Sequence, residues 1–292
     1  MLNKLILIPA QREKIFQQGS RTYFYASRFF PDEIKKEVTI LYAFVRTADN
    51  YVDSIPPAKD SFINFKREFN GVWQGQVSDN WIITDFVKLA KKKEFSKDWI
   101  DAFLKAMESD LNSQPYKNLA ETESYIYGSA EVVGLMMAKI MNLSPESYQG
   151  ARLLGKSMQY INFIRDLKED ENLGRQYLPL TEIESFGLNN LSSQEIKTKP
   201  ENFNNFIKKQ LARYTAWQQE AERYYHFIPA RFLIPIKTAA DMYLYTAQKI
   251  AKNPLIVLEK KIKPEPISII LKGFENIITI LWKKSFPFTK RR

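Results

Sequence analysis

The sequence predicts an all-α protein, and three observations support this fold class. Apolar residues recur at spacings of three and four over long stretches, as they do on the buried face of a helix. Glycine is scarce, at 10 of 292 residues, and the alternating pattern of strands is weak throughout. Hydrophobic residues make up 45% and aromatic residues 14% of the chain, which is enough for a sizeable globular core.

The periodicity places the expected helices to within a few residues at each end. They cover about 9–19, 32–54, 59–74, 80–92, 96–112, 121–142, 145–171, 201–226, 229–252 and 266–284. Pro31 followed by Asp32 marks the start of the second helix, and Pro56 lies just beyond its end.

Loops are expected near 54–59, 143–145, 174–200 and 253–266. The longest, 174–200, is rich in Asn, Ser and Thr and could join two domains. Strong helical patterns on both sides favour a flap on one domain instead. We therefore expect a single domain over residues 1–292.

Cysteine is absent and His226 is the one histidine, which excludes several kinds of site. Disulfides, zinc–thiolate sites and thiol nucleophiles cannot form, and a multi-histidine metal site or a Ser-His-Asp triad is hard to build. His226 lies among aromatic residues in RYYHFIP, where a structural role is expected.

The start of the chain, MLNKLILIPAQ, has an apolar run too short for a secretory signal and no cleavage motif after it. No stretch reaches the roughly 18 apolar residues that a membrane span needs. We expect a cytoplasmic protein, soluble or peripheral at a membrane.

The net charge of +10 indicates an anionic partner, such as a phosphorylated substrate, lipid headgroups or nucleic acid. Residues 259–292 hold nine Lys or Arg against three Glu, a local net charge of +6. The basic residues do not form a motif with interleaved aromatic side chains, so no nucleic-acid partner is expected.

The segment LYAFVRTADNYVD combines a polar stripe with an apolar helix. Tyr42, Arg46, Asn50 and Asp53 follow at steps of four, four and three, and Asp49 lies three residues after Arg46. At 3.6 residues per turn these side chains share one face. The apolar positions around them are Ile40, Leu41, Ala43, Phe44, Val45, Ala48 and Val52. The helix is therefore expected to be buried on most sides, with its polar stripe turned toward an internal cleft.

A second segment, QYINFIRDLKED, repeats this design. Gln159, Asn162, Asp166 and Asp170 follow at steps of three, four and four, with Arg165 beside them. The apolar neighbours are Ile161, Phe163, Ile164 and Leu167. If the two helices run antiparallel and face one another, four carboxylates surround a central cavity.

Carboxylate and amide oxygens are the ligands that Mg²⁺ prefers, and arginine fits phosphate oxygens bidentately. The pair of stripes therefore predicts a cage for Mg²⁺ bound to a diphosphate, with Mn²⁺ as an alternative ion. A single Asp-x-x-x-Asp pair is common by chance on exposed helices. Two copies, each with an arginine and set in apolar helix, favour a functional site.

The two long motifs resemble the squalene/phytoene synthase family, the head-to-head trans-isoprenyl diphosphate synthases. LYAFVRTADNYVD matches the first aspartate motif of the family, and QYINFIRDLKEDENLGRQYLP matches the second. GSRTYFYASRFFP resembles its N-terminal Ser-Lys/Arg-Ser/Thr-Phe segment. The resemblance runs over about 17–281, which implies a catalytic core of that extent, an isoprenoid-synthase-type helical bundle, and a basic tail over 282–292.

The resemblance also implies roles for individual residues. Asp49 and Asp53 would bind Mg²⁺ on one substrate, and Asn162, Asp166 and Asp170 would bind it on the other side. The residues implied to hold or polarise diphosphate are Ser20, Arg21, Thr22, Tyr42, Arg46 and Arg165. The side chains expected to act most directly in catalysis are Asp49, Asp53, Asp166, Asp170, Tyr42 and Arg46.

Three further positions complete the implied substrate site. Gln159 would line the cavity near the reacting carbons. Tyr125 in YIYGSAEVVGLMM corresponds to a cavity tyrosine of the family, and Tyr243 in DMYLYTAQKI to one near the diphosphate.

The reaction of the family has two halves. One prenyl diphosphate ionises and its allylic cation attacks the double bond of a second, which gives a cyclopropylcarbinyl diphosphate. This intermediate ionises again and rearranges, and it ends by proton loss in phytoene synthases or by hydride from NADPH in squalene synthases. The resemblance is strongest to phytoene synthase, so NADPH is not expected, and the substrate would be geranylgeranyl diphosphate. A squalene or dehydrosqualene synthase using farnesyl diphosphate is the first alternative, and a non-catalytic interaction protein is the second.

The sequence departs from the family in two places. Glu131, in SAEVVG, stands where many members have glycine, and it could point away or alter the cavity. Where many members carry a C-terminal arginine, this chain has Lys260, Lys261 and Lys263, which can meet phosphate only as point charges.

The C-terminal segment reads as an amphipathic helix. Its apolar face comprises Ile267, Ile270, Leu271, Phe274, Ile277, Ile278 and Leu281. Followed by the basic FPFTKRR, it could rest on an anionic membrane or close the core as a final packed helix.

Overall fold

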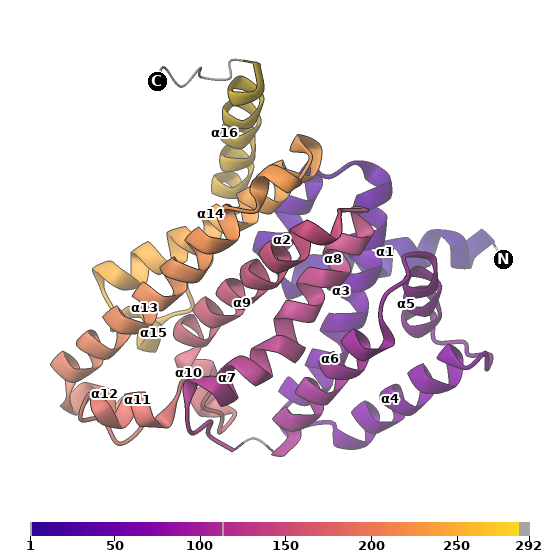
Figure 1. Ribbon diagram of the computed structural model, residues 1–292. Helices are drawn as coiled ribbons and strands as arrows, with labels where there is room; N and C mark the ends of the chain where they lie inside the picture. The colour runs from indigo at the N-terminus through magenta and orange to yellow at the C-terminus, as the bar shows by residue number, and fades with distance from the viewer. Residues whose placement is uncertain (1, 113, 286–292) are drawn as a thin grey trace.

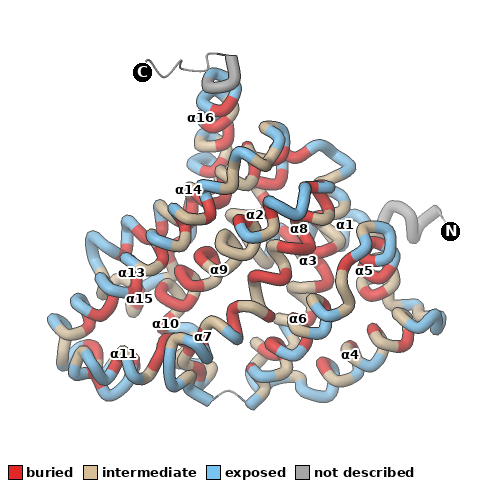
Figure 2. The backbone as a smooth tube through the Cα atoms, in the orientation of Figure 1, coloured by how far each residue is buried: buried red, intermediate tan, exposed pale blue. Residues whose placement is uncertain are grey.

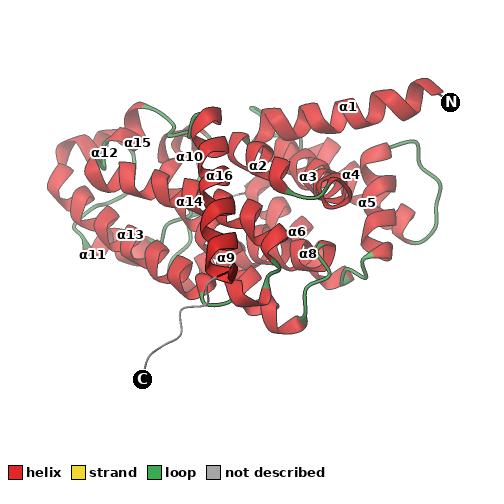
Figure 3. Ribbon diagram, turned by 90° about the horizontal axis from the view of Figure 1, so that it is seen from above, coloured by secondary structure: helices red, strands yellow, loops and turns green. Residues whose placement is uncertain are grey.

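The computed structural model describes residues 2–112 and 114–285, and within this part the secondary structure is helical, with no strand (Figure 1, Figure 3). The prediction of an all-α protein is confirmed. Most of the predicted basic tail, from residue 286 onward, lies outside the described residues.

The longer helices follow the sequence prediction closely. They are α1 (Leu2–Gly19), α3 (Asp32–Asp53), α4 (Lys59–Trp73), α5 (Trp81–Lys92), α6 (Lys97–Ser109), α7 (Leu119–Ile126), α8 (Val132–Ile140), α9 (Tyr148–Arg165), α13 (Pro200–Glu222), α14 (Ala230–Lys252) and α16 (Pro266–Ser285). The first begins seven residues earlier than predicted, and Pro9 lies within it.

Several short helices were missed by the periodicity because none is long enough to show it. They are α2 (Arg21–Ala26), α11 (Leu180–Ser185), α12 (Ser193–Thr198) and α15 (Ile256–Glu259). A further short helix, α10 (Leu167–Asn172), lies almost wholly within the predicted helix 145–171. The prediction of a loop over 174–200 was therefore wrong, since α11 and α12 occupy much of it. Ser192 caps α12 by accepting a hydrogen bond from the Glu195 amide at 3.2 Å.

Helix α9 lies at the centre of the molecule. It packs against α13, α8 and α14, and α3 lies behind α8 and α6 (Figure 1). Figure 2 shows buried positions concentrated on the facing sides of these helices. The core is rich in aromatic contacts: Phe44 on α3 stacks on Phe86 of α5, with ring centroids 3.7 Å apart. Burying such rings is the main stabilising contribution of these contacts.

Small residues let α9 approach both α8 and the turn before it, residues 127–131, to backbone contact. A Cβ atom on Gly134 would lie 2.3 Å from the carbonyl oxygen of Ala151, and one on Gly155 would lie 2.5 Å from that of Ala130. Neither neighbour is a flexible side chain, so this spacing requires glycine at both positions.

A π-helical segment, Tyr127–Glu131, joins α7 to α8. The sequence predicted one regular helix over 121–142 and did not show this segment. Apolar spacing does not reveal a single extra residue in one helical turn. Such π-bulges are rare and frequently occur at functional sites.

Helix α16 packs on α14 and α2 by one side only. Ile269, Gly273, Asn276 and Ile280 are buried, and a Cβ atom on Gly273 would lie 2.2 Å from the ring of Phe29. The outer side carries exposed Ile267, Leu271, Phe274 and Ile278, among others. Of the seven apolar residues predicted for one face, five are therefore exposed, Leu281 among them. No helix in the described chain has the length and hydropathy to cross a bilayer.

Candidate active site

A cavity of about 790 Å³ lies between α2, α3, α6, α8, α9 and α14. Every site residue predicted from the sequence lines it. These residues are Ser20, Arg21, Thr22, Tyr42, Arg46, Asp49, Asp53, Tyr125, Gln159, Asn162, Arg165, Asp166, Asp170 and Tyr243. The two polar stripes thus face the same space, although they are more than 100 residues apart in the sequence.

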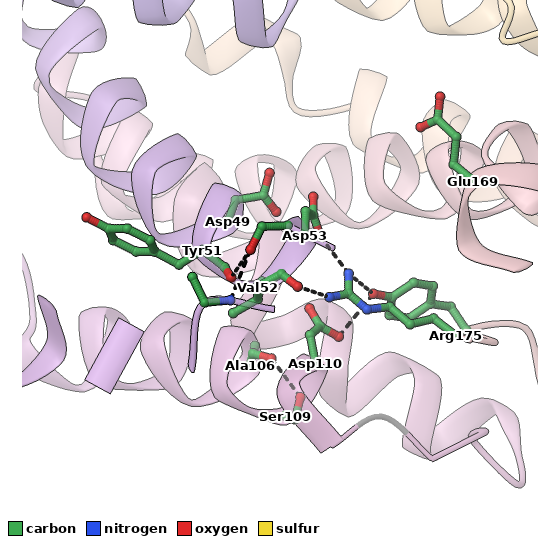
Figure 4. A network of polar contacts seen from close by, with 12 residues as sticks. Asp49, Tyr51, Val52, Asp53, Ala106, Ser109, Asp110, Glu169 and Arg175 are labelled. Atoms are coloured by element: carbon green, nitrogen blue, oxygen red, sulfur yellow. Dashed lines mark hydrogen bonds and ion pairs between the residues drawn. The ribbon is translucent and has the colours of Figure 1, made fainter. Parts of the chain in front are cut away.

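The carboxylates of the first stripe, on α3, each meet a cation. Arg46 donates a hydrogen bond to Asp49 within the same helix. Asp53, at the last position of α3, accepts one from Nη1 of Arg175 at 2.6 Å (Figure 4). Arg175 is buried and also donates to the carbonyl oxygen of Val52 at 2.7 Å, so it fixes the end of α3.

Asp110 is a cavity residue that sequence reasoning missed. It lies just beyond α6, and its buried carboxylate accepts hydrogen bonds from Tyr125 at 2.7 Å and Tyr177 at 3.0 Å. Figure 4 shows it on the same side of the site as Asp53 and Arg175. A lone Asp at a helix end has no partner at helical spacing, so no sequence pattern could reveal it.

The second stripe is divided between two helices, because α9 ends at Arg165 and α10 begins at Leu167. Asp166 between them has φ −97° and ψ 13°, outside regular helix. The backbone bonds from Asp166 to Asn162 and from Asp170 to Asp166 persist, at 2.8 and 2.9 Å. The predicted spacing of the stripe therefore survives the break.

Asp166 is held by two cations. Arg165 binds it bidentately, with both nitrogen–oxygen distances 2.6 Å, and Nζ of Lys261 lies 3.2 Å from Oδ2. Burial raises the pKa of Asp166, but Arg165 and Lys261 outweigh it, so that the pKa lies below its usual value. Asp166 is therefore a stable anion at neutral pH.

Other acids in the cavity titrate at higher pH. Burial, together with repulsion by Asp53, raises the pKa of Asp49 to about 7. Burial raises the pKa of Asp110 to about 6, and burial with repulsion by Asp166 raises that of Asp170. A cation bound among these carboxylates would reduce their mutual repulsion and stabilise their ionised forms.

The oxygen atoms of the cavity fit a hard cation. The Oδ1 atom of Asn162 is buried and has no hydrogen-bond partner, and Asp170 forms no ion pair among the described residues. Within the described chain, no three acidic or histidine side chains converge closely enough to hold a metal by themselves. An ion here would need oxygens from water or substrate as well, which is how Mg²⁺ is commonly bound.

Several uncharged groups and one more arginine also line the cavity. Ser20 caps α2 by accepting a hydrogen bond from the Tyr23 amide at 3.2 Å, and Nη1 of Arg21 lies 3.4 Å from Oε1 of Glu265. Tyr42 stacks on Phe16, with ring centroids 4.2 Å apart. A Cβ atom on Gly19 would lie 2.4 Å from the Tyr42 hydroxyl, so Gly19 permits this close approach.

Glu131, the departure noted in the sequence, is not among the residues that line the cavity. It is buried and accepts a hydrogen bond from Nε of Arg152 on α9 at 2.8 Å. The carboxylate therefore points away from the cavity and ties the π-helical segment to α9. Lys261 and Lys263 line the cavity, whereas Lys260 lies outside it.

Comparison with known proteins identifies the family. The family model for squalene/phytoene synthase matches residues 16–266, most of the chain. The chain belongs to the squalene/phytoene synthase family. The resemblance seen in the two aspartate motifs is therefore confirmed.

Named relatives within this family are distant. A 15-cis-phytoene synthase from Pantoea ananas is 25% identical over 283 residues, which cover 89% of each chain. Phytoene synthase 3, chloroplastic, from Zea mays is 26% identical over 223 residues, 72% of this chain and 51% of that protein. The chain thus spans about half the length of this plant relative.

Solved structures show the same fold. A dehydrosqualene synthase superposes with a TM-score of 0.82 at 20% identity, covering 95% of this chain and 96% of the other. The squalene synthase HpnC from Alicyclobacillus acidocaldarius gives a TM-score of 0.72 at 18% identity, covering 83% and 92%.

Proposed function

We propose that this protein is a prenyltransferase that joins two prenyl diphosphates head to head, with two geranylgeranyl diphosphates giving phytoene as the reaction. The observation that carries the proposal is the meeting of both aspartate stripes in one cavity that also has apolar walls. The names of the relatives, phytoene synthases from a bacterium and a plant, favour phytoene as the product.

The proposed ion site comprises Asp49 and Asp53 on one side and Asn162, Asp166 and Asp170 on the other. When bound, Mg²⁺ would draw negative charge from the leaving diphosphate. The carboxylates of the chain serve to hold positive charge near the diphosphate end of each substrate. Asp166, kept anionic by Arg165 and Lys261, is suited to this role over a wide pH range.

We assign the binding of diphosphate oxygens to the cations and hydroxyls around this site. The planar guanidinium groups of Arg46 and Arg165 can each bind two phosphate oxygens, and the ammonium groups of Lys261 and Lys263 add positive charge. The same cavity is also lined by Ser20, Arg21, Thr22, Tyr42 and Tyr243. These groups would orient the C1–O bond that breaks and stabilise the diphosphate that leaves.

The prenyl chains are assigned to the apolar part of the cavity. Its wall includes Ala130, Val133, Gly134 and Met137 from the π-helical segment and α8. Methionine conforms to an irregular hydrocarbon, and small residues leave it room. Exclusion of water from this part would protect the carbocations until a proton is lost, and the faces of aromatic rings such as Phe163 would stabilise them.

The alternatives differ in substrate or in class. The solved relatives are named dehydrosqualene and squalene synthases, which keeps farnesyl diphosphate and a C30 product as the second candidate. A non-catalytic relative is disfavoured because all four aspartates are present and line the cavity.

A peripheral membrane contact through α16 is part of the proposal, because the hydrocarbon product is insoluble in water. The exposed apolar residues of α16 support it.

The test is incubation of the purified protein and Mg²⁺ with geranylgeranyl or farnesyl diphosphate, with and without NADPH, and analysis of the extracted lipids. We expect a C40 hydrocarbon from the longer substrate without NADPH. Asp49→Asn and Asp166→Asn should lower its formation at least about 100-fold, the scale on which loss of one electrostatic group acts.

Asp79→Asn, at an exposed position away from the cavity, is the matched control and should leave turnover unchanged. A C30 product would show that the substrate is farnesyl diphosphate and would leave the proposed head-to-head reaction unchanged. Absence of turnover of either substrate by well-folded protein would refute the proposal.

A further inference from the structure

Two cations share the carboxylate of Asp166 in the second aspartate stripe. The guanidinium group of Arg165 binds both carboxylate oxygens, each at 2.6 Å, and Nζ of Lys261 lies 3.2 Å from Oδ2. Lys261 also donates a hydrogen bond to Glu169 on α10. By contrast, Asp170, one turn further along, forms no ion pair within residues 2–112 and 114–285. Positive charge in this stripe is therefore concentrated on Asp166.

Of the two cations, Lys261 is the one that can leave Asp166. Arg165 is held by two parallel hydrogen bonds at the end of α9, whereas Lys261 makes one longer contact with Asp166. The other partner of Lys261, Glu169, is 53% exposed, so water can replace that contact. Buried Ile262 and Pro264 hold the backbone between α15 and α16. The flexible side chain of Lys261 can thus change partners while its backbone stays fixed.

Other cations lie within reach of a displaced Lys261. A second hollow, of about 470 Å³, adjoins the large cavity, and Lys261 lines both. Arg21 and Lys263 also line both. Arg21 and Lys263 are among the groups assigned above to the diphosphate. A lysine that turned away from Asp166 would therefore remain beside the diphosphate of a bound substrate.

We propose that Lys261 exchanges Asp166 for the substrate diphosphate when a divalent ion binds to the second aspartate stripe. The ammonium group leaves Asp166 because a second cation on the same carboxylate would repel it. It then meets diphosphate oxygens, where its charge is paired again. Lys261 thereby couples ion binding to substrate binding. This inference rests on the proposed function, from which it takes the ion site and the diphosphate.

Two simpler roles for Lys261 lead to different expectations. A fixed lysine that only orients Asp166 would leave ion affinity unchanged, or lower it, when the lysine is removed. A general effect of positive charge in the cavity would act equally from Lys261 and Lys263. Lys263 lines the same cavity, but in the described part of the chain no carboxylate lies within ion-pair distance of it. Lys263 is therefore the matched control position.

The first test is titration of the full-length protein with Mn²⁺, with the free ion measured by electron paramagnetic resonance. Lys261→Met removes the charge and keeps an unbranched apolar side chain. We expect it to bind Mn²⁺ about threefold or more tightly than the wild type, the scale on which one partly exposed ion pair acts. Lys263→Met should bind Mn²⁺ like the wild type.

The second test measures the binding of inorganic diphosphate by isothermal titration calorimetry, at one fixed concentration of Mg²⁺ for all proteins. Lys261→Met should bind diphosphate about threefold or more weakly than the wild type, because one charged partner of the diphosphate is lost. Tighter ion binding together with weaker diphosphate binding in the same variant is the result that exchange predicts. A fixed lysine does not produce these opposite shifts.

Other results would overturn the inference. Mn²⁺ binding that is unchanged or weaker in Lys261→Met would leave Lys261 as a fixed partner of Asp166. Equal tightening in Lys263→Met would assign the effect to general charge. Wild-type protein that binds no Mn²⁺ would refute the exchange together with the ion site. Opposite shifts without turnover of either prenyl diphosphate would support the exchange and refute the proposed reaction, whereas turnover without the shifts would refute the exchange alone.

Discussion

Asp49 and Asp53 lie one turn apart on α3, yet their surroundings differ. Asp49 is paired within its own helix by Arg46, whereas Asp53 is paired by Arg175, which follows α10 in the sequence. The sequence pattern predicted both aspartates and Arg46, because these share one helix. It could not predict the partner of Asp53, since contact between α3 and residue 175 exists only in the folded chain.

Arg175 should contribute to stability as well as to the site. Arg175→Gln removes the bonds to Asp53 and to the Val52 carbonyl, which leaves a buried acceptor unpaired. We expect the free energy of unfolding to fall by about 1–3 kcal/mol, measured by urea denaturation. Asp53 is partly exposed, so water offsets some of the loss of its partner.

The control for this change is Arg223→Gln. Arg223 forms an exposed pair with Glu220 at 2.9 Å within α13 and the turn after it. Its loss should change the free energy of unfolding by no more than about 0.5 kcal/mol. Equal effects of the two substitutions would mean that the Arg175 contacts do not stabilise the end of α3.

At the scale of elements, the packing of α9 against the π-helical segment and α8 depends on glycine. Gly155→Ala would place a Cβ atom 2.5 Å from the Ala130 carbonyl, in backbone that cannot rotate away. We expect a loss of about 1–3 kcal/mol in the free energy of unfolding, because the two helices must separate. Thermal or urea unfolding would measure it.

Gly71→Ala in α4 is the contrasting substitution. Its Cβ atom would meet Oε1 of Gln76 at 2.3 Å, which is the mobile end of a side chain. Alanine also favours helix over glycine by up to about 1 kcal/mol. Gly71→Ala should therefore be neutral or stabilising, and a cost equal to that of Gly155→Ala would contradict the role assigned to helix contact.

The long helices were predictable from apolar periodicity, whereas their irregularities were not. The spacing of apolar residues continues almost unchanged across the break at Asp166 and across the π-helical segment. The sequence therefore predicted a single helix over 145–171 and a single helix over 121–142. The short helices α11 and α12 are only six residues each, too few to show a period. The Asn- and Ser-rich composition around them indicated a loop instead.

For the whole molecule, the all-α fold and the shared cavity followed from the two stripes and the family resemblance. The depth and walls of the cavity did not, because they depend on how α8, α9 and α14 pack. Glu131 illustrates the difference. The sequence shows a glutamate at this position, but its ion pair with Arg152 depends on how the π-helical segment packs against α9.

The acids of the cavity make the stability of the whole protein depend on pH, and the Mg²⁺ site that we propose would couple this dependence to the ion. Burial raises the pKa values of Asp49 and Asp110 to about 7 and about 6, so these two carboxyl groups bind protons more tightly in the folded protein than in the unfolded chain. The stability gained from protonation is present at low pH and lost as pH rises through 6 and 7. An ion bound at the carboxylates would replace these protons.

We therefore expect MgCl₂ to raise the melting temperature more at pH 8 than at pH 5.5, measured by scanning fluorimetry. In Asp49→Asn the melting temperature of the metal-free protein should depend less on pH over this range, and the Mg²⁺ effect should shrink. Equal Mg²⁺ effects at both pH values, or an unchanged effect in the variant, would contradict this linkage.

The π-helical segment between α7 and α8 also acts as a register shift. One residue in an α-helix corresponds to a rotation of about 100° about the helix axis. Deleting a single residue from Tyr127–Glu131 would therefore turn the following helix by that angle and carry Val133, Gly134 and Met137 away from the cavity. The wall of the prenyl site thus depends on the length of this segment as well as on its composition, and family members could alter the cavity by an insertion or deletion here without any substitution among the residues that line it.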